Sequence, residues 1–194
     1  MLQRLEFLIP DTTVAALILL PVFIYLNRTI IRNHFKSVLY YLLSVYFAGV
    51  YSVAGLPDLC YIRFFPNINL HLFAYMFSDL DTTLLNILLF LPLGFMLPVL
   101  WTHFKSGPAT VCAGLITSCI IEFFQVFTFR ASDINDLFTN TAGTLIGWIC
   151  AKIAAKYLPE NTCEHTTRNL WITCAVTFVI MFFIHPLLSK FIGI

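Results

Sequence analysis

Six apolar runs, each roughly 20 residues long, constrain this chain more than any other feature of its sequence. A helix needs about 20 mostly apolar residues to cross the hydrocarbon core of a bilayer, and only a helix satisfies the backbone polar groups of an open chain in lipid. The runs cover residues 12–26, 37–56, 83–101, 109–129, 137–157 and 170–188. The sequence therefore predicts an all-α, polytopic membrane bundle of about six transmembrane helices, forming a single domain over residues 1–194.

Composition supports a membrane protein and excludes several other classes. Hydrophobic residues make up 59% of the 194 residues and charged residues 11%, whereas soluble domains have about 25% charged residues. The net charge of +1, without a basic stripe, argues against nucleic acid as a partner. The sequence contains no CxxC, HExxH or glycine-rich phosphate loop, so no cofactor is predicted. Most of the six cysteines fall within apolar runs, so no disulfide framework is expected.

Lysine and arginine residues predict the orientation, because they concentrate in short cytoplasmic loops. One set of loops carries Arg28, Arg32, Lys36, Lys105, Lys152, Lys156 and Arg168. The opposite side carries Arg4, Arg63, Arg130 and Lys190. We therefore expect a multi-pass protein with both termini outside the cell.

The connection between the second and third runs, residues 57–80, is long and rich in aromatic residues. Within it, the stretch FFPNINLHLFAYMF (64–77) is too apolar for a solvated loop and too short to span a bilayer. These properties favour an amphipathic helix lying in the membrane interface and anchored by its aromatic side chains. A re-entrant segment is the alternative.

Seven polar residues from three runs and one turn share a predicted depth near the outer leaflet. Ionisable groups within membrane segments usually face a protein interior or a watery cavity, so a functional site is the default interpretation. The spacing of Glu122 and Gln125 places both on one helix face, as does that of Asp133, Asp136 and Asn140. The candidate site residues are Asn86, Glu122, Gln125, Arg130, Asp133, Asp136 and Asn140.

The residue types suggest a chemical role for each member of this set. The guanidinium of Arg130 can hold a carboxylate or a phosphate through two parallel hydrogen bonds. Glu122 and Asp136 are the candidate catalytic residues, since carboxylates in a desolvated position suit acid–base chemistry. Asn86, Gln125, Arg130, Asp133 and Asn140 are the candidate substrate-binding residues.

Structural interpretations compete with these roles. Asp133 or Ser132 could serve only as the N-cap of the fifth helix, and Glu122 with Arg130 could form a buried structural pair. Two or three of the carboxylates could instead bind a divalent cation such as Mg²⁺ or Ca²⁺, although no motif requires one.

Pro92 and three glycines predict how the third and fifth helices are shaped and packed. Pro92 predicts a kink in the third helix, and Gly94 allows another chain segment to approach its backbone. Gly143 and Gly147 form a GxxxG pair, which favours close helix packing.

Three blocks of this sequence together resemble the VanZ-like family of bacterial membrane proteins: NILLFLPLG (86–94), EFFQ (122–125) and RASDINDLFTNTAGTLIG (130–147). The family pattern has Asn and Phe-x-Pro-x-Gly on one helix and Glu-x-x-Gln ending the next. Arg-x-x-Asp-x-x-Asp-x-x-x-Asn-x-x-Gly follows. The matching positions are Asn86, Phe90, Pro92, Gly94, Glu122, Gln125, Arg130, Asp133, Asp136, Asn140 and Gly143. The resemblance covers about residues 80–155.

The resemblance implies where the protein acts and what it binds. The eponymous member confers low-level resistance to teicoplanin, a lipoglycopeptide, without changing the peptidoglycan precursor that the drug binds. We therefore expect an outward-facing polar pocket that binds a lipid headgroup or the acylated drug at the surface of the bacterial cell membrane. The alternative is a membrane enzyme that uses Glu122 and Asp136 on a lipid-linked envelope substrate. A transporter is less favoured, because the charges lie at one membrane face.

Overall fold

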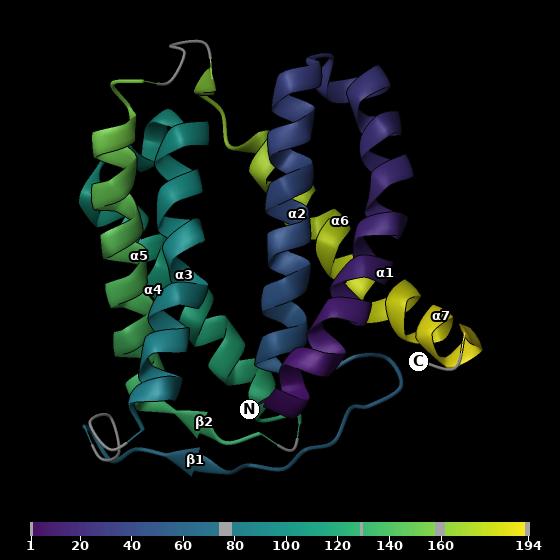
Figure 1. Ribbon diagram of the computed structural model, residues 1–194, viewed down its shortest axis with the longest axis vertical. Coiled ribbons are helices and arrows are strands. Elements are labelled where there is room, and N and C mark those ends of the chain that lie inside the picture. The colour runs from purple at the N-terminus through teal and green to yellow at the C-terminus, as the bar shows by residue number, and fades with distance from the viewer. Residues whose placement is uncertain (1, 74–78, 129, 158–161, 193–194) are drawn as a thin grey trace. The chain divides into compact units, whose positions relative to one another are not determined.

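The protein is almost entirely helical. The computed structural model describes residues 2–73, 79–128, 130–157 and 162–192 (Figure 1). The chain divides into two compact units, one formed by residues 1–64 and 168–194 and the other by residues 65–167. The first combines the two ends of the chain, and the second contains the middle.

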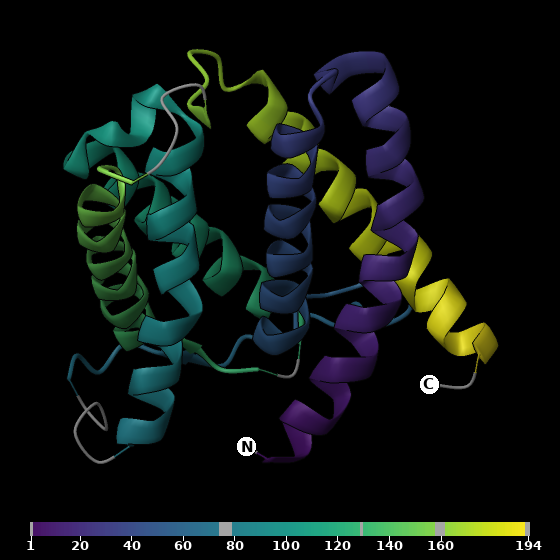
Figure 2. The ribbon, with the colours of Figure 1, turned by 45° about the horizontal axis from the view of Figure 1, so that its top comes forward.

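The first unit is built from two antiparallel helices and a long C-terminal helix. Helix α1 (Leu2–Leu26) continues into a π-helical turn (Asn27–Ile31), and α2 (His34–Ala54) returns beside it. The C-terminal helix consists of α6 (Arg168–Val179), a second π-helical turn (Ile180–Ile184) and α7 (His185–Ile192). It packs against both α1 and α2 and crosses them obliquely (Figure 2).

Local chemistry explains where α2 begins and ends. Asn33 is the N-cap, and its side chain accepts a hydrogen bond from the Lys36 N–H at 3.0 Å. Gly55 ends the helix with a φ of 59°, a left-handed conformation in which a glycine has no Cβ penalty. Deeper in the unit, the hydroxyls of Ser44 and Thr177 share a hydrogen bond of 2.7 Å that joins α2 to α6.

The second unit is a three-helix bundle with a small sheet at one end. Helix α3 (Leu80–Leu100) leads through a 3₁₀ turn (Thr102–Lys105) to α4 (Gly107–Gln125), and α5 (Ile134–Ala154) follows. Strand β1 (Ile68–Asn69) pairs in parallel with β2 (Ser132–Asp133). Figure 1 shows this pair at the end of the bundle where α3 begins and α4 ends.

Five helical segments are long enough and apolar enough to cross a membrane, which confirms the predicted membrane bundle. They are Ile9–Ile31, His34–Ala54, Leu80–Leu100, Gly107–Gln125 and Arg168–Phe191. Helix α5 has 21 residues, as many as α3, but it is less apolar than the other five. All six cysteines are free in this structure.

The lower apolarity of α5 has a structural reason, because its polar side faces the protein. Asn135, Thr139, Asn140 and Thr144 are buried, and the Thr139 and Thr144 hydroxyls bond to backbone carbonyls within the helix. Its exposed side carries large apolar side chains instead: Phe138, Leu145, Ile146, Ile149 and Ile153. Because α3 and α4 pack against the polar side of α5, a helix with these asparagine and threonine residues can cross the membrane.

The prediction of an interfacial helix in residues 64–77 is wrong for the part that the structure describes. Residues 64–71 contain no helix and include strand β1, Leu72 and Phe73 form a turn, and residues 74–78 lie outside the described chain. The backbone of this segment bonds to the turn after α4, with the Phe65 N–H donating to the Val126 carbonyl and the Ser132 N–H donating to the Asn67 carbonyl. This pairing across some 60 positions of sequence supplies the hydrogen bonds that a helix would have supplied locally.

The turn after α4 also shortens that helix, which was predicted to reach residue 129. Both the N–H and the hydroxyl of Thr128 donate to the Gln125 carbonyl at 3.0 Å, so the chain leaves the helix at Gln125. Helix α5 correspondingly begins at Ile134 rather than at residue 137.

Glycines allow α3 and α5 to pack backbone against backbone, as the GxxxG pair predicts. A Cβ atom on Gly143 would overlap the Ile87 carbonyl, and one on Gly147 would overlap the Leu91 carbonyl. On the facing helix, a Cβ on Gly94 would overlap the Thr144 carbonyl. These contacts make α3 and α5 the most closely associated helix pair in the bundle.

We predict that Gly143→Ala separates this pair. The added methyl group meets the backbone, which cannot move aside as a side chain would, so we expect the free energy of unfolding to fall by about 1–3 kcal/mol. Thermal unfolding of the purified protein in detergent measures the change. Gly49→Ala is the matched control, since a Cβ there meets only Thr12 Oγ1 at 3.8 Å. Equal melting temperatures for wild type and Gly143→Ala would contradict this account of the packing.

Candidate functional site

The seven predicted site residues lie in the second unit, on α3, on the last turn of α4, on the following turn and on the first half of α5. Three helices and the sheet meet there, because β2 leads directly into α5 and pairs with β1. We call Glu122, Arg130, Asp133 and Asp136 the charged cluster.

Glu122 is buried at the end of α4, with 8% of its surface exposed. Its Oε2 accepts hydrogen bonds from the Ser132 hydroxyl and from the Asp133 N–H, both at 2.8 Å. The same hydroxyl lies 2.9 Å from the Glu122 carbonyl oxygen. One carboxylate oxygen therefore holds the end of α4 to the start of α5. The other, Oε1, is buried and has no hydrogen-bond partner among the described residues.

Asp133 is the N-cap of α5, which confirms the capping interpretation for this residue. Its Oδ1 accepts from the N–H of Asn135 at 2.9 Å and from the Asn135 side-chain amide at 2.8 Å. Its Oδ2 accepts from the Asn69 side-chain amide at 2.9 Å. Both oxygens are therefore engaged, one within α5 and one with β1.

Asn135 holds residues 65–73, which we call the strap, against the start of α5. Its side-chain amide donates to the His71 carbonyl at 3.0 Å, and its Oδ1 accepts from the Phe73 N–H at 2.7 Å. Phe73 adopts a left-handed φ of 60°, unusual for a bulky residue, and its ring lies 5.8 Å from that of Phe138. The strap is thus fixed by specific bonds over the end of the bundle.

Asp136 lies in the first turn of α5 and receives a partner from α3. Its Oδ1 accepts a hydrogen bond from the Asn86 side-chain amide at 2.7 Å. Arg130, half-buried in the turn, is close enough to attract the same carboxylate electrostatically. The structure thus brings together residues that are about 50 positions apart in the sequence.

Gln125 and Asn140 are the most buried of the predicted binding residues, with 5% and 4% exposure. The Gln125 carbonyl accepts the bonds that form the turn after α4. Asn140 lies deeper, and its amide donates to the Ser118 hydroxyl of α4 at 2.8 Å. Asn140 Oδ1 is buried without a hydrogen-bond partner in the described part of the chain.

The three carboxylates of the cluster lie within electrostatic range of one another. Asp133 and Asp136 each repel Glu122, and Asp133 repels Asp136. Among the described residues, no group of three or more His, Cys, Asp or Glu side chains is arranged to hold a metal ion. The arrangement instead offers an acceptor-rich interior with a cation at its edge.

Sequence reasoning missed two residues of this network, Asn69 and Asn135. Asn69 lies in a stretch that was predicted to be helical, so its pairing with Asp133 had no visible basis. The alternation PNIN at residues 66–69 was the available signal, because asparagine is rare in strongly apolar segments. Asn135 lies between Asp133 and Asp136, and an uncharged residue at that position gave no separate signal of a site.

Comparison with known proteins identifies the family. Residues 12–155 match the VanZ/LLP1 family, which is about three quarters of the chain. The chain belongs to the VanZ/LLP1 family. The match begins well before residue 80, where the resemblance was predicted to start, so the first two membrane helices of this VanZ/LLP1 protein are part of the family region as well. No curated protein and no solved structure matches the chain.

We predict that Glu122 of this VanZ/LLP1 protein has separable structural and chemical roles. Glu122→Ala leaves the Asp133 N–H unpaired, which costs about 1–3 kcal/mol, and leaves the Ser132 hydroxyl only the backbone carbonyl of residue 122 as acceptor. Glu122→Gln keeps one acceptor oxygen for these donors and removes the charge. We therefore expect a much lower melting temperature for Glu122→Ala and a nearly unchanged one for Glu122→Gln. Equal loss of stability in both variants would show that the charge itself holds the turn.

Proposed function

We propose that this VanZ/LLP1 membrane protein binds an amphiphile, a lipid headgroup or a lipoglycopeptide of the teicoplanin type, at the charged cluster on the outer face of the cell membrane. Binding there would change how the drug reaches the membrane surface or how the envelope is maintained. Family membership and the membrane helices support a location of the protein in a membrane. The geometry of the cluster supports the binding role.

One observation carries this proposal, namely that two buried acceptor oxygens have no donor. Glu122 Oε1 and Asn140 Oδ1 are both enclosed and unbonded among the described residues, on adjacent helices that meet at this end of the bundle. A buried polar atom without a partner costs about 1–3 kcal/mol, so few are kept without a reason. Hydroxyl or ammonium groups of a ligand would satisfy both oxygens.

Arg130 supplies a positive charge at the edge of the charged cluster, where it could bind the anionic group of a ligand. Its guanidinium is always charged and can hold a phosphate or carboxylate through two parallel hydrogen bonds. A ligand that carries donors and one anionic group would match the acceptors inside and the cation outside. Lipid headgroups and acylated glycopeptides both have this combination of groups.

We predict that resistance depends on the acceptor at Glu122. Expression in a susceptible Gram-positive host should raise the minimal inhibitory concentration of teicoplanin, and Glu122→Gln should return it to that of the host alone, because the amide places a donor where the ligand needs an acceptor. Asp81→Asn, an exposed charge change in the first turn of α3, is the matched control and should behave as wild type. Unchanged sensitivity to every lipoglycopeptide on expression of the wild type would refute the resistance form of the proposal.

A second candidate function is an enzyme acting on a lipid-linked envelope substrate. The observation that favours it is the proximity of two buried or half-buried carboxylates, Glu122 and Asp136, each with a defined hydrogen-bond partner. Such a pair suits general acid–base chemistry.

Envelope lipids distinguish the two candidates. If the protein only binds its ligand, mass spectrometry should find the same lipid species in cells with wild type, with Glu122→Gln and without the gene. A lipid that appears or disappears with wild type, and does not change with the folded Glu122→Gln variant, would favour the enzyme.

A further inference from the structure

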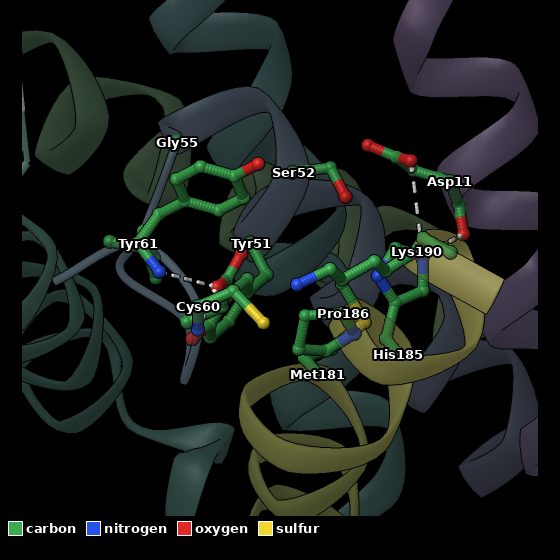
Figure 3. Close-up of a pocket in the computed structure, with 13 residues that line it drawn as sticks. Asp11, Tyr51, Ser52, Gly55, Cys60, Tyr61, Met181, His185, Pro186 and Lys190 are labelled. Atoms are coloured by element: carbon green, nitrogen blue, oxygen red, sulfur yellow. Dashed lines mark hydrogen bonds and ion pairs between the residues drawn. The ribbon is translucent and has the colours of Figure 1, made fainter. Parts of the chain in front are cut away.

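The first unit contains a separate half-open pocket of about 700 Å³. Its walls come from three places: the start of the α1 span at Asp11, the end of α2 from Tyr51 to Leu56 with the turn that follows, and the C-terminal helix from Met181 to Lys190 (Figure 3). The C-terminal helix lies beyond the region that matches the family. The pocket therefore belongs to a part of the chain that the charged cluster does not use.

Carboxylate and aromatic groups line one part of this pocket. Asp58 Oδ1 accepts hydrogen bonds from the N–H groups of Cys60 and Tyr61, at 2.8 and 3.0 Å, so the turn holds the carboxylate in place. These bonds all fall on Oδ1, and Oδ2 has no bond to a described residue. Asp11 is near enough to Asp58 for their charges to repel each other. Tyr51 and Tyr61 line the same pocket, across the view from Asp11 in Figure 3.

An ammonium group is the ligand that these side chains fit. A positive charge between Asp11 and Asp58 would relieve their repulsion, and aromatic faces attract cations within about 6 Å. Tyr61 is available for such a contact, since 76% of its surface is exposed.

Donor groups on the C-terminal helix line the pocket next to Asp11 (Figure 3). His185 is buried, with Nε2 lying 3.2 Å from the Asp11 carbonyl oxygen, which can only accept, so this nitrogen donates. The same nitrogen lies 3.9 Å from Asp11 Oδ1. Its other nitrogen lies 3.5 Å from the Ser189 hydroxyl. Lys190 also lines the pocket (Figure 3). Ser189 and Lys190 together provide a hydroxyl and a cation for a phosphate.

The position of the pocket along the membrane spans indicates which part of a lipid it would meet. Asp11, Tyr51 and His185 all lie near the ends of candidate membrane spans, and the ends of such spans are expected at the level of the lipid headgroups. We propose that this pocket binds an ammonium–phosphate zwitterion, such as the headgroup of phosphatidylethanolamine. Asp11, Asp58 and the tyrosine rings bind the ammonium, and Lys190 and Ser189 bind the phosphate.

Lipid titration of the purified full-length protein tests the proposal. Native mass spectrometry would compare phosphatidylethanolamine with phosphatidylglycerol of the same acyl chains, which has the phosphate without the ammonium. We expect tighter binding of phosphatidylethanolamine, and Asp58→Asn should weaken it by three- to tenfold while leaving phosphatidylglycerol unchanged. Asparagine keeps Oδ1 for the turn, so the fold should be retained.

Tyr61→Leu provides a second variant at an exposed side chain, and should weaken phosphatidylethanolamine binding without altering the melting temperature. Asp81→Asn and Lys156→Gln are matched charge controls outside the pocket, and both should bind as wild type. Soluble phosphoethanolamine identifies the source: binding as tight as that of the lipid supports a free zwitterion as ligand, and much tighter binding of the lipid supports a headgroup.

Equal binding of both lipids by wild type would overturn the proposal. So would unchanged binding of phosphatidylethanolamine by the folded Asp58→Asn and Tyr61→Leu variants. Glu122→Gln should have no effect on this binding, which keeps the outcome separate from the function proposed for the charged cluster.

Discussion

The buried carboxylate of Glu122 joins two helix ends, and the arrangement of the second unit depends on that contact. In a membrane, polar groups away from water must find partners within the protein. Glu122 Oε2 meets this requirement for Ser132 and for the Asp133 backbone. Asp133 can then cap α5 and bond to Asn69, so the contact extends from α4 through the turn to β1. Loss of the first contact would therefore loosen each of the others.

The arrangement of the second unit also depends on the close packing of α3 against α5. Because the glycines bring the two backbones together, a side chain as short as Asn86 reaches Asp136 at 2.7 Å. Glu122 and Asn140 each use one polar atom to hold neighbouring helices, and each has a second, buried acceptor without a partner among the described residues. If these acceptors bind a ligand as proposed, the binding region needs few residues beyond those that maintain the fold.

The sequence predicted the local and periodic features well and the long-range pairing poorly. Helical spacing placed Glu122 and Asp136 at one end of the bundle, and the GxxxG pair predicted close packing, because both depend on residues that are near one another in sequence. The strap was assigned to an interfacial helix, since aromatic content does not distinguish a helix from an extended segment held by distant partners. A strand of two residues, such as β1, is too short to show an alternating pattern. The pairing of Asn69 with Asp133 therefore could not be predicted from the sequence.

The inward polar face of α5 has a consequence for how the protein enters the membrane during synthesis. Isolated helices partition into lipid according to their apolarity, and asparagine and aspartate near one end oppose this step. Helices α3 and α4 are made first and are apolar enough to insert by themselves. Helix α5 would then enter against a surface already present, with its amide and hydroxyl groups meeting protein rather than lipid. Biogenesis of the bundle is thus expected to follow the order of the chain, with the last helix depending on the two before it.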